Sequence, residues 1–228
     1  MNDCLNFQLI KSKRRRKTIS LHIKEGGNIV IRAPHKASKR EIEEFIREKE
    51  AWVVEQLVEE KERRKELQKA FVPGEKFLYL GESYPLKIDE SDRKELPLKL
   101  SFGKFVLNSD RVEEARDLFI EWYKGEAKEK IEGRVRYYSD RFHLLPKGIK
   151  ITGAKSRWGS CSRDNRLSFS WRIIMAPLRI IDYILVHELV HIEEKNHSRN
   201  FWTALEKILP DYRERRVWLR KNGHRLWL

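Results

Sequence analysis

The sequence predicts an α+β fold, in which an N-terminal antiparallel sheet and helix module precedes a second domain. Short segments that alternate between apolar and polar residues are typical of half-buried strands, and they occur in separate groups along the chain. Longer segments with apolar residues at helical spacing lie between these groups. The 228 residues are 40% hydrophobic and 11% aromatic, which suffices for a packed core and excludes a mainly disordered chain.

The N-terminal segment is predicted to contain a small sheet followed by one long helix. Its strands are expected at residues 7–10, 18–23 and 29–33. The turn Glu25-Gly26-Gly27-Asn28 joins the last two strands, so we expect an antiparallel meander. Ser38 and Glu41 have the spacing of a capping box, in which each side chain bonds the other residue's backbone amide. A helix is therefore predicted from Ser38 to about Lys69.

Short strands are expected again over residues 75–108, and Asp110 is expected to cap a second long helix. We place the domain boundary between these two segments. Residues 1–108 are then a strand-rich module with one long helix, and residues 109–228 form the second domain.

The second domain contains the clearest strand of the chain, residues 167–173, in which apolar and polar residues alternate without exception. A turn before this strand predicts a hairpin with the segment that ends at Cys161. After Pro177, the apolar residues predict a largely buried helix from about Leu178 to Glu194. Ser198 and Asp211 are expected to cap two closing helices.

Composition points to a basic protein of a reducing compartment. Neither Cys4 nor Cys161 fits a disulfide framework or a CxxC pair, no apolar run reaches the roughly 20 residues of a membrane span, and the N-terminus is too polar for a signal peptide. We therefore expect a soluble cytoplasmic protein with no membrane partner.

The formal net charge is +14, and the densest basic run spans residues 11–17. Arg14, Arg15 and Arg16 in this run are candidate contacts to nucleic acid. The alternative is a solvated loop between two strands.

The predicted buried helix carries His187, Glu188 and His191 in the pattern HExxH. Residues four apart lie on one face of a helix, so both imidazoles can reach one zinc ion at about 2.0 to 2.1 Å. Glu188 then has the position of the general base that acts on a zinc-activated water. A helix bearing two uncoordinated histidines and a glutamate among apolar residues would be costly.

A third protein ligand must come from outside this helix. Glu194 lies about 10 Å along the helix axis from His187, which is too far. His197 follows His191 closely, and Asn196 tolerates the left-handed conformation that turns the chain back, so we expect His197 to be the third ligand. Asp211 and Glu214 are the alternatives.

The segment before Cys161 is a second candidate for function. An edge strand beside the metal helix could pair with extended substrate backbone, and Arg157 could contact the substrate or the developing oxyanion. The alternative for this segment is a glycine bulge and a core Trp158. No sequence neighbour of Cys161 is suited to activating a thiolate, so we do not expect a cysteine nucleophile.

Several segments together resemble the YgjP-like family of predicted zinc metallopeptidases, which is related to the SprT-like and WLM proteins. These segments are Trp158-Gly159-Ser160-Cys161-Ser162, Ala176-Pro177, the run from Asp182 to His191, Asn196-His197-Ser198 and Phe201-Trp202. The resemblance implies a zincin-like catalytic domain with one zinc ion per chain on His187, His191 and His197, and catalysis by Glu188. The metzincin motif has glycine where this chain has Glu194, so no Met-turn is expected.

We therefore expect hydrolysis of a peptide or protein substrate by a zinc-activated water. Two alternatives remain open. One is a zinc-stabilised nucleic-acid-binding module without turnover, and the other is a zinc amidohydrolase that acts on a non-protein substrate.

Overall fold

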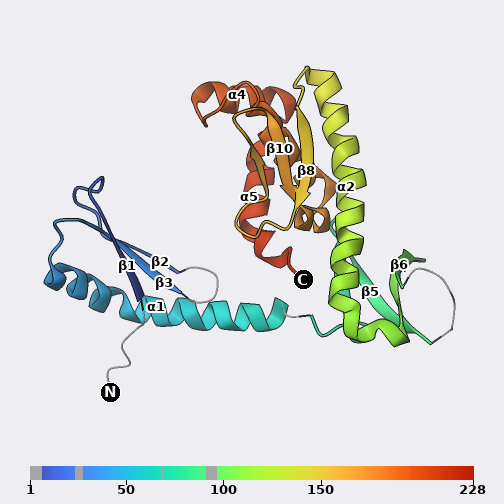
Figure 1. Cartoon of the computed structure of the whole chain (residues 1–228), viewed down its shortest axis with the longest axis horizontal. Helices are drawn as coiled ribbons and strands as arrows, with labels where there is room; N and C mark the ends of the chain where they lie inside the picture. Colours follow the sequence, from blue (N-terminus) through green and yellow to red (C-terminus); the bar gives the residue numbers. More distant parts are fainter. Residues whose placement is uncertain (1–6, 24–27, 68, 91–96) are drawn as a thin grey trace. The chain divides into compact units, whose positions relative to one another are not determined.

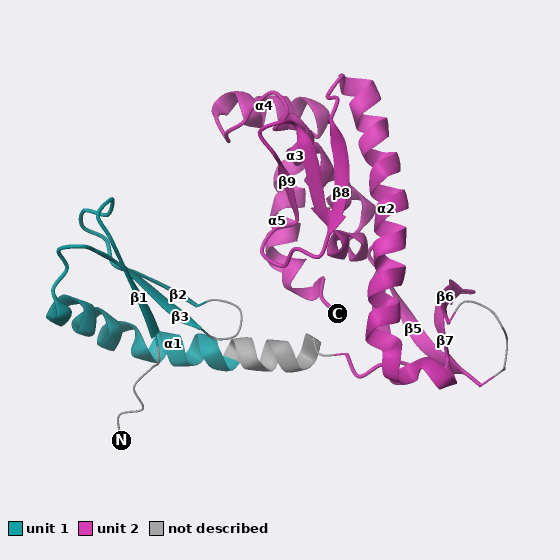
Figure 2. Cartoon of the chain, in the orientation of Figure 1, with its two compact units in different colours: residues 1–68 teal, residues 69–228 magenta. Residues whose placement is uncertain are grey.

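The computed structural model of the chain describes residues 7–23, 28–67, 69–90 and 97–228, and it leaves the side chains of residues 59–67 undescribed. It confirms the α+β class (Figure 1). The chain divides into two units, Met1–Gln68 and Lys69–Leu228 (Figure 2). Cys4 and most of the turn at residues 25–28 lie outside the described residues. Within the described part, no helix is long and apolar enough to cross a membrane.

The first unit is a three-stranded sheet with one helix. Its elements are β1 (Phe7–Ser12), β2 (Ser20–Ile23), β3 (Ile29–Pro34) and α1 (Lys39–Leu67). The strand order is β1-β3-β2, with β1 parallel and β2 antiparallel to β3. The expected antiparallel meander is therefore wrong in one pairing. β3 is the most apolar of the three strands and occupies the central position of the sheet. β1 and β2 lie on either side of it and run in opposite directions.

The core of this unit joins β3 to one face of α1. Buried Ile29, Ile31 and Ala33 pack with Ile42 and Val53 of the helix. The predicted capping box is confirmed at the start of this helix. The Ser38 amide donates to Glu41 Oε2 at 2.7 Å, and the Glu41 amide donates to Ser38 Oγ at 3.2 Å.

The second unit begins with a four-stranded sheet of order β4-β5-β7-β6, followed by a long helix. The elements are β4 (Lys76–Tyr79), β5 (Glu82–Asp89), β6 (Leu98–Ser101), β7 (Lys104–Asn108), the 3-10 turn Ser109–Glu114 and α2 (Ala115–Phe142). Asp110 falls within the 3-10 turn, which has Asn108 at its N-cap and no side-chain capping bond. The α-helix therefore begins four residues later than the capping pattern predicts.

This sheet packs against α2, and it therefore belongs to the same unit as that helix. The Phe77 and Phe119 rings stack with centroids 4.1 Å apart, and Phe105 lies 4.9 Å from Phe119. These aromatic contacts join residues 76–108 to the helix that follows them. The structural division after Gln68 thus differs from the boundary that we placed after residue 108, because sequence alone does not show which helix a sheet covers.

The remainder of the second unit contains a small sheet and three helices. The elements are β8 (Gly148–Thr152), β9 (Gly159–Cys161), β10 (Arg166–Ser170), the 3-10 turn Trp171–Met175, α3 (Leu178–Val190), α4 (Arg199–Ile208), α5 (Tyr212–Asn222) and the 3-10 turn Gly223–Arg225. β10 is central, parallel to β8 and antiparallel to β9, so the predicted hairpin forms and β9 is an edge strand. β10 ends at Ser170, before the predicted end of the strand at Ile173. The chain continues there as a 3-10 helix, although apolar and polar residues alternate up to Ile173.

Candidate metal centre

The last turn of α3 and the residue after it provide two imidazoles. His187 lies within α3, which ends at Val190, and His191 is its C-cap residue. The helix is shorter than the predicted 178–194, but His191 keeps right-handed helical backbone angles. The two rings therefore stay on one face, with centroids 5.0 Å apart.

The third imidazole comes from the turn between α3 and α4. Ser198 caps α4 by accepting a bond from the Phe201 amide at 3.4 Å, and Asn196 Oδ1 accepts one from the Ser198 amide at 3.1 Å. These bonds fix the turn on both sides of His197. The Nε2 atoms of His197 and His187 are 3.0 Å apart, and the three histidines place one ligand nitrogen each within 4.8 Å of one another.

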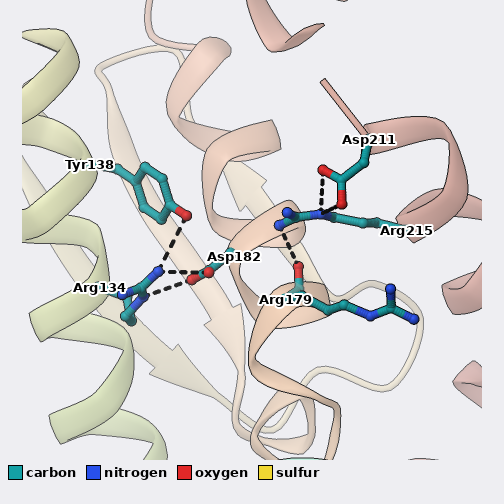
Figure 3. Close-up of polar contacts among 6 residues, drawn as sticks. All are labelled: Arg134, Tyr138, Arg179, Asp182, Asp211 and Arg215. Carbon is teal, nitrogen blue, oxygen red and sulfur yellow. Dashed lines mark hydrogen bonds and ion pairs between the residues drawn. The ribbon is translucent and has the colours of Figure 1, made fainter. Parts of the chain in front are cut away.

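The two carboxylate alternatives lie elsewhere. Asp211 pairs with Arg215 at 2.9 Å, and the same guanidinium donates to the Arg179 carbonyl at 2.9 Å (Figure 3). The Arg215 hydrogen bond also lowers the pKa of Asp211. Glu214 is exposed on α5. Over the described residues, the group with metal-binding geometry consists of His187, His191 and His197.

The surroundings of two of the histidines favour the neutral imidazole, which is the form that binds metals. Burial, followed by the neighbouring histidines, lowers the pKa of His187 to about 3, and burial also lowers the pKa of His197. His191 Nδ1 lies 2.8 Å from the Glu194 carbonyl, so it donates there and leaves Nε2 as an acceptor. Three imidazoles that converge on one point are a donor set that fits zinc.

Aromatic rings pack against the three imidazoles. The Phe201 ring lies 4.5 Å from His191, and the Trp202 ring stacks on His197 at 5.6 Å. Arg216 on α5 lies over Trp202 at 5.0 Å, and its charge contributes to the lowered pKa of His187. The sequence did not single out Arg216, because only the packing of α5 on α3 brings it to the site.

Glu188 follows His187 but faces the small sheet. It is 8% exposed, and burial raises its pKa to about 7, while a backbone hydrogen bond from Cys161 and the charge of Arg157 act in the opposite direction. A Cβ at Gly159 would lie 2.7 Å from Glu188 Cγ, so β9 approaches the carboxylate as closely as a glycine allows. The sequence analysis considered Gly159 as a bulge and did not predict its contact with Glu188.

The other candidates differ in their surroundings. Arg157 is exposed, just before β9, and its charge acts on Glu188. Trp158 packs against the core near Gly223, in agreement with a structural role. Burial raises the pKa of the Cys161 thiol, the opposite of what activates a cysteine nucleophile.

The candidate nucleic-acid contacts lie in the first unit. Arg14 and Arg16 are exposed, and Arg15 donates to Ser20 Oγ at 2.9 Å.

An ion pair fixes α3 against α2. Arg134 Nε and Nη2 donate to the two carboxylate oxygens of Asp182 at 2.7 and 2.6 Å, and Arg134 also donates to Tyr138 Oη at 3.3 Å (Figure 3). The side chain of Asp182 is 9% exposed. This pair lies on the helix that carries His187, so it holds the start of that helix in place.

Replacing Arg134 with alanine is expected to lower the free energy of unfolding by about 3 kcal/mol, because the buried Asp182 carboxylate loses its partner. Chemical denaturation followed by circular dichroism measures the change. Arg136→Ala, an exposed arginine on the same helix, is the matched control and should change stability by less than about 0.5 kcal/mol. Equal midpoints for the two variants would show that the ion pair does not stabilise the fold.

Comparisons with known proteins identify the family of the chain and a similarity to solved structures. A family model described as "YgjP-like, metallopeptidase domain" matches residues 17–222, which include the three histidines and Glu188. The chain is also similar to the crystal structure of the metallopeptidase zymogen of Pyrococcus abyssi abylysin, with 21% identity and a TM-score of 0.36. That similarity covers 40% of this chain and 93% of the other. No curated protein matches the chain significantly.

Proposed function

The chain belongs to the YgjP-like family of metallopeptidase domains, and from this premise we propose that it hydrolyses peptide bonds with one zinc ion per chain. The observation that carries the proposal is the convergence of His187, His191 and His197, together with the burial of Glu188, which follows His187 in the chain. These three imidazoles would hold the metal. When bound, zinc would supply Lewis acidity, which polarises a carbonyl and makes water acidic.

Glu188 is the proton carrier in this proposal. Its carboxylate accepts the proton of the attacking water and returns it to the amine that leaves. The Glu188 side chain is buried and lies against Gly159 of β9. The contact with Gly159 restricts the side chain to a small range of positions, which suits a general base that must act at one place.

The free edge of β9 would bind the substrate. An extended peptide can add as a further strand there, because β9 pairs with β10 on one side only. Arg157 stands just before this edge and would contact the substrate or the oxyanion. The main-chain bonds of such an added strand are independent of side-chain identity, so they give affinity for unfolded segments rather than for one sequence.

The proposal is tested by incubating the full chain with an unfolded protein, with zinc or with a chelator, and identifying new peptide termini by mass spectrometry. We expect new termini with zinc only. A chain that cleaves no peptide but hydrolyses the amide bond of a small non-protein molecule to a carboxylate and an amine would instead be the zinc amidohydrolase.

The exposed basic run in the first unit supports a second function, binding of nucleic acid. If Arg14, Arg15 and Arg16 contact phosphates, replacing all three with alanine should weaken binding to any sequence. The slope of log K against log salt should also fall by about 2 to 3. Fluorescence anisotropy across a salt series measures both quantities.

The control for this experiment is the triple variant Lys36→Ala, Arg40→Ala and Arg47→Ala, which removes the same charge from other exposed positions of the unit. Equal binding by the two triple variants would show that the effect is one of net charge alone. No binding by the wild type at physiological salt would end the nucleic-acid proposal. The cytoplasmic location stays a prediction from composition.

A further inference from the structure

A pocket of about 380 Å³, lined by polar groups together with Ala154 and Trp158, lies along the small sheet of the second unit. Its lining includes Arg157, Gly159 and Ser160 around β9, Ser168 and Ser170 of β10, and Thr152 at the end of β8. The metal centre described above uses none of these hydroxyl groups. The pocket therefore adds a recognition surface that the hydrolytic step does not require.

The pocket contains hydrogen-bond donors and no acidic side chain. Within the described residues, the structure gives no hydrogen bond or ion pair to the side chains of Arg157, Ser160 or Ser168, whereas Ser170 Oγ donates to the Ala154 carbonyl at 2.9 Å. A guanidinium with hydroxyl groups nearby is a donor set suited to a carboxylate. The chemistry of the lining thus favours an anionic group over an apolar or cationic one.

Two lining residues also border the catalytic carboxylate. Gly159 is in contact with Glu188, and the Arg157 charge acts on it. Ser160 pairs with Ser168 and Gly159 pairs with Phe169 across the hairpin, so the two serines face away from the side on which Glu188 lies. A peptide added to the free edge of β9 has side chains that alternate between these two faces. Residues next to the cleaved bond can therefore reach the pocket.

We propose that this pocket binds an acidic side chain of the peptide substrate, close to the cleaved bond, with Arg157 as the residue that recognises it. The inference rests on the proposed peptidase function and adds a substrate class to it: extended segments with aspartate or glutamate at one fixed position. Such a pocket supplies the side-chain selectivity that strand addition on β9 lacks.

The test begins with digestion of a randomised synthetic peptide library by the zinc-loaded full chain. We expect acidic residues to be enriched at one position near the cleaved bond. Two peptides that differ only by glutamate or glutamine at that position are then compared. The glutamate peptide should have a kcat/KM about tenfold higher or more, which is typical of a charge-assisted pair at a partly exposed site.

Arg157→Gln should reduce this ratio to about one while leaving the zinc content unchanged. Ser168→Ala should reduce the ratio by a smaller factor. Arg163→Gln is the matched control, because Arg163 is exposed in the β9–β10 turn and does not line the pocket, and it should keep the full ratio. A variant at Arg157 that slows both peptides equally would overturn the pocket and assign Arg157 to the reaction itself.

Binding to the chelator-treated, metal-free wild type separates this inference from the proposed function. Fluorescence anisotropy of the two labelled peptides should show tighter binding of the glutamate peptide, and Arg157→Gln should abolish the difference. If the zinc-loaded chain cleaves neither peptide, the peptidase proposal fails, whatever the binding result. If the peptides bind equally, or are cleaved equally, the pocket proposal fails alone.

Discussion

His197→Ala is expected to lower the zinc affinity of the chain by at least about 100-fold. Loss of a partner that only orients a ligand typically costs 10- to 100-fold, and loss of a ligand itself should cost more. His197 Nε2 is 3.0 Å from His187 Nε2, and the capped turn before α4 holds it there. Competition with a calibrated chelator, on purified protein whose fold is checked by circular dichroism, measures the change.

Asp211→Ala and Glu214→Ala are the matched controls, because both were alternatives for the third ligand. Asp211 is occupied by Arg215 and Glu214 points into solvent, so both variants should bind zinc nearly as tightly as the wild type. A site that survives the loss of His197 but collapses without Glu214 would place the chain among the glutamate-liganded zincins.

Glu188→Gln is expected to lower peptide turnover by about three orders of magnitude while zinc stays bound. General acid–base catalysis contributes about 10² to 10⁴ in rate, and an amide of nearly the same shape cannot accept the proton. The change removes no metal ligand and creates no cavity beside Gly159. Zinc content and kcat, measured on one preparation, decide between a catalytic and a structural role.

Glu193→Gln is the control for this substitution, since Glu193 is an exposed acid of the same segment. It should keep both zinc and turnover. Full activity in Glu188→Gln would remove Glu188 from the mechanism. Loss of zinc from that variant would mean that the carboxylate supports the metal site instead.

Local patterns were sufficient for the parts of the site that lie close together in sequence. The spacing of His187 and His191 places both rings on one face, whatever the rest of the fold does. Ser38 and Ser198 cap their helices as predicted, because a capping bond depends on residues three apart. The short turn to His197 also follows from the five residues that separate it from His191. The expected left-handed conformation at Asn196 is wrong, and its side chain instead accepts a hydrogen bond from the Ser198 amide.

Features that depend on contacts between distant segments were not predictable. Neither the β1–β3 pairing nor the packing of residues 76–108 on α2 has a local signature, so the strand direction and the position of the division were missed. The same holds for the contact of Gly159 with Glu188 and for the place of Arg216 over Trp202. Each of these joins elements whose register is set by tertiary packing.

The most direct test of the hydrolytic centre is a zinc titration of the metal-free full chain, with peptide cleavage as the readout. Cleavage should rise linearly with added zinc and reach a plateau at one ion per chain, because we propose that the three converging histidines hold a single ion. The His197→Ala variant should show no such plateau at the same concentrations. Cleavage that is independent of zinc, or a wild-type chain that binds one ion and cleaves nothing, would contradict the account.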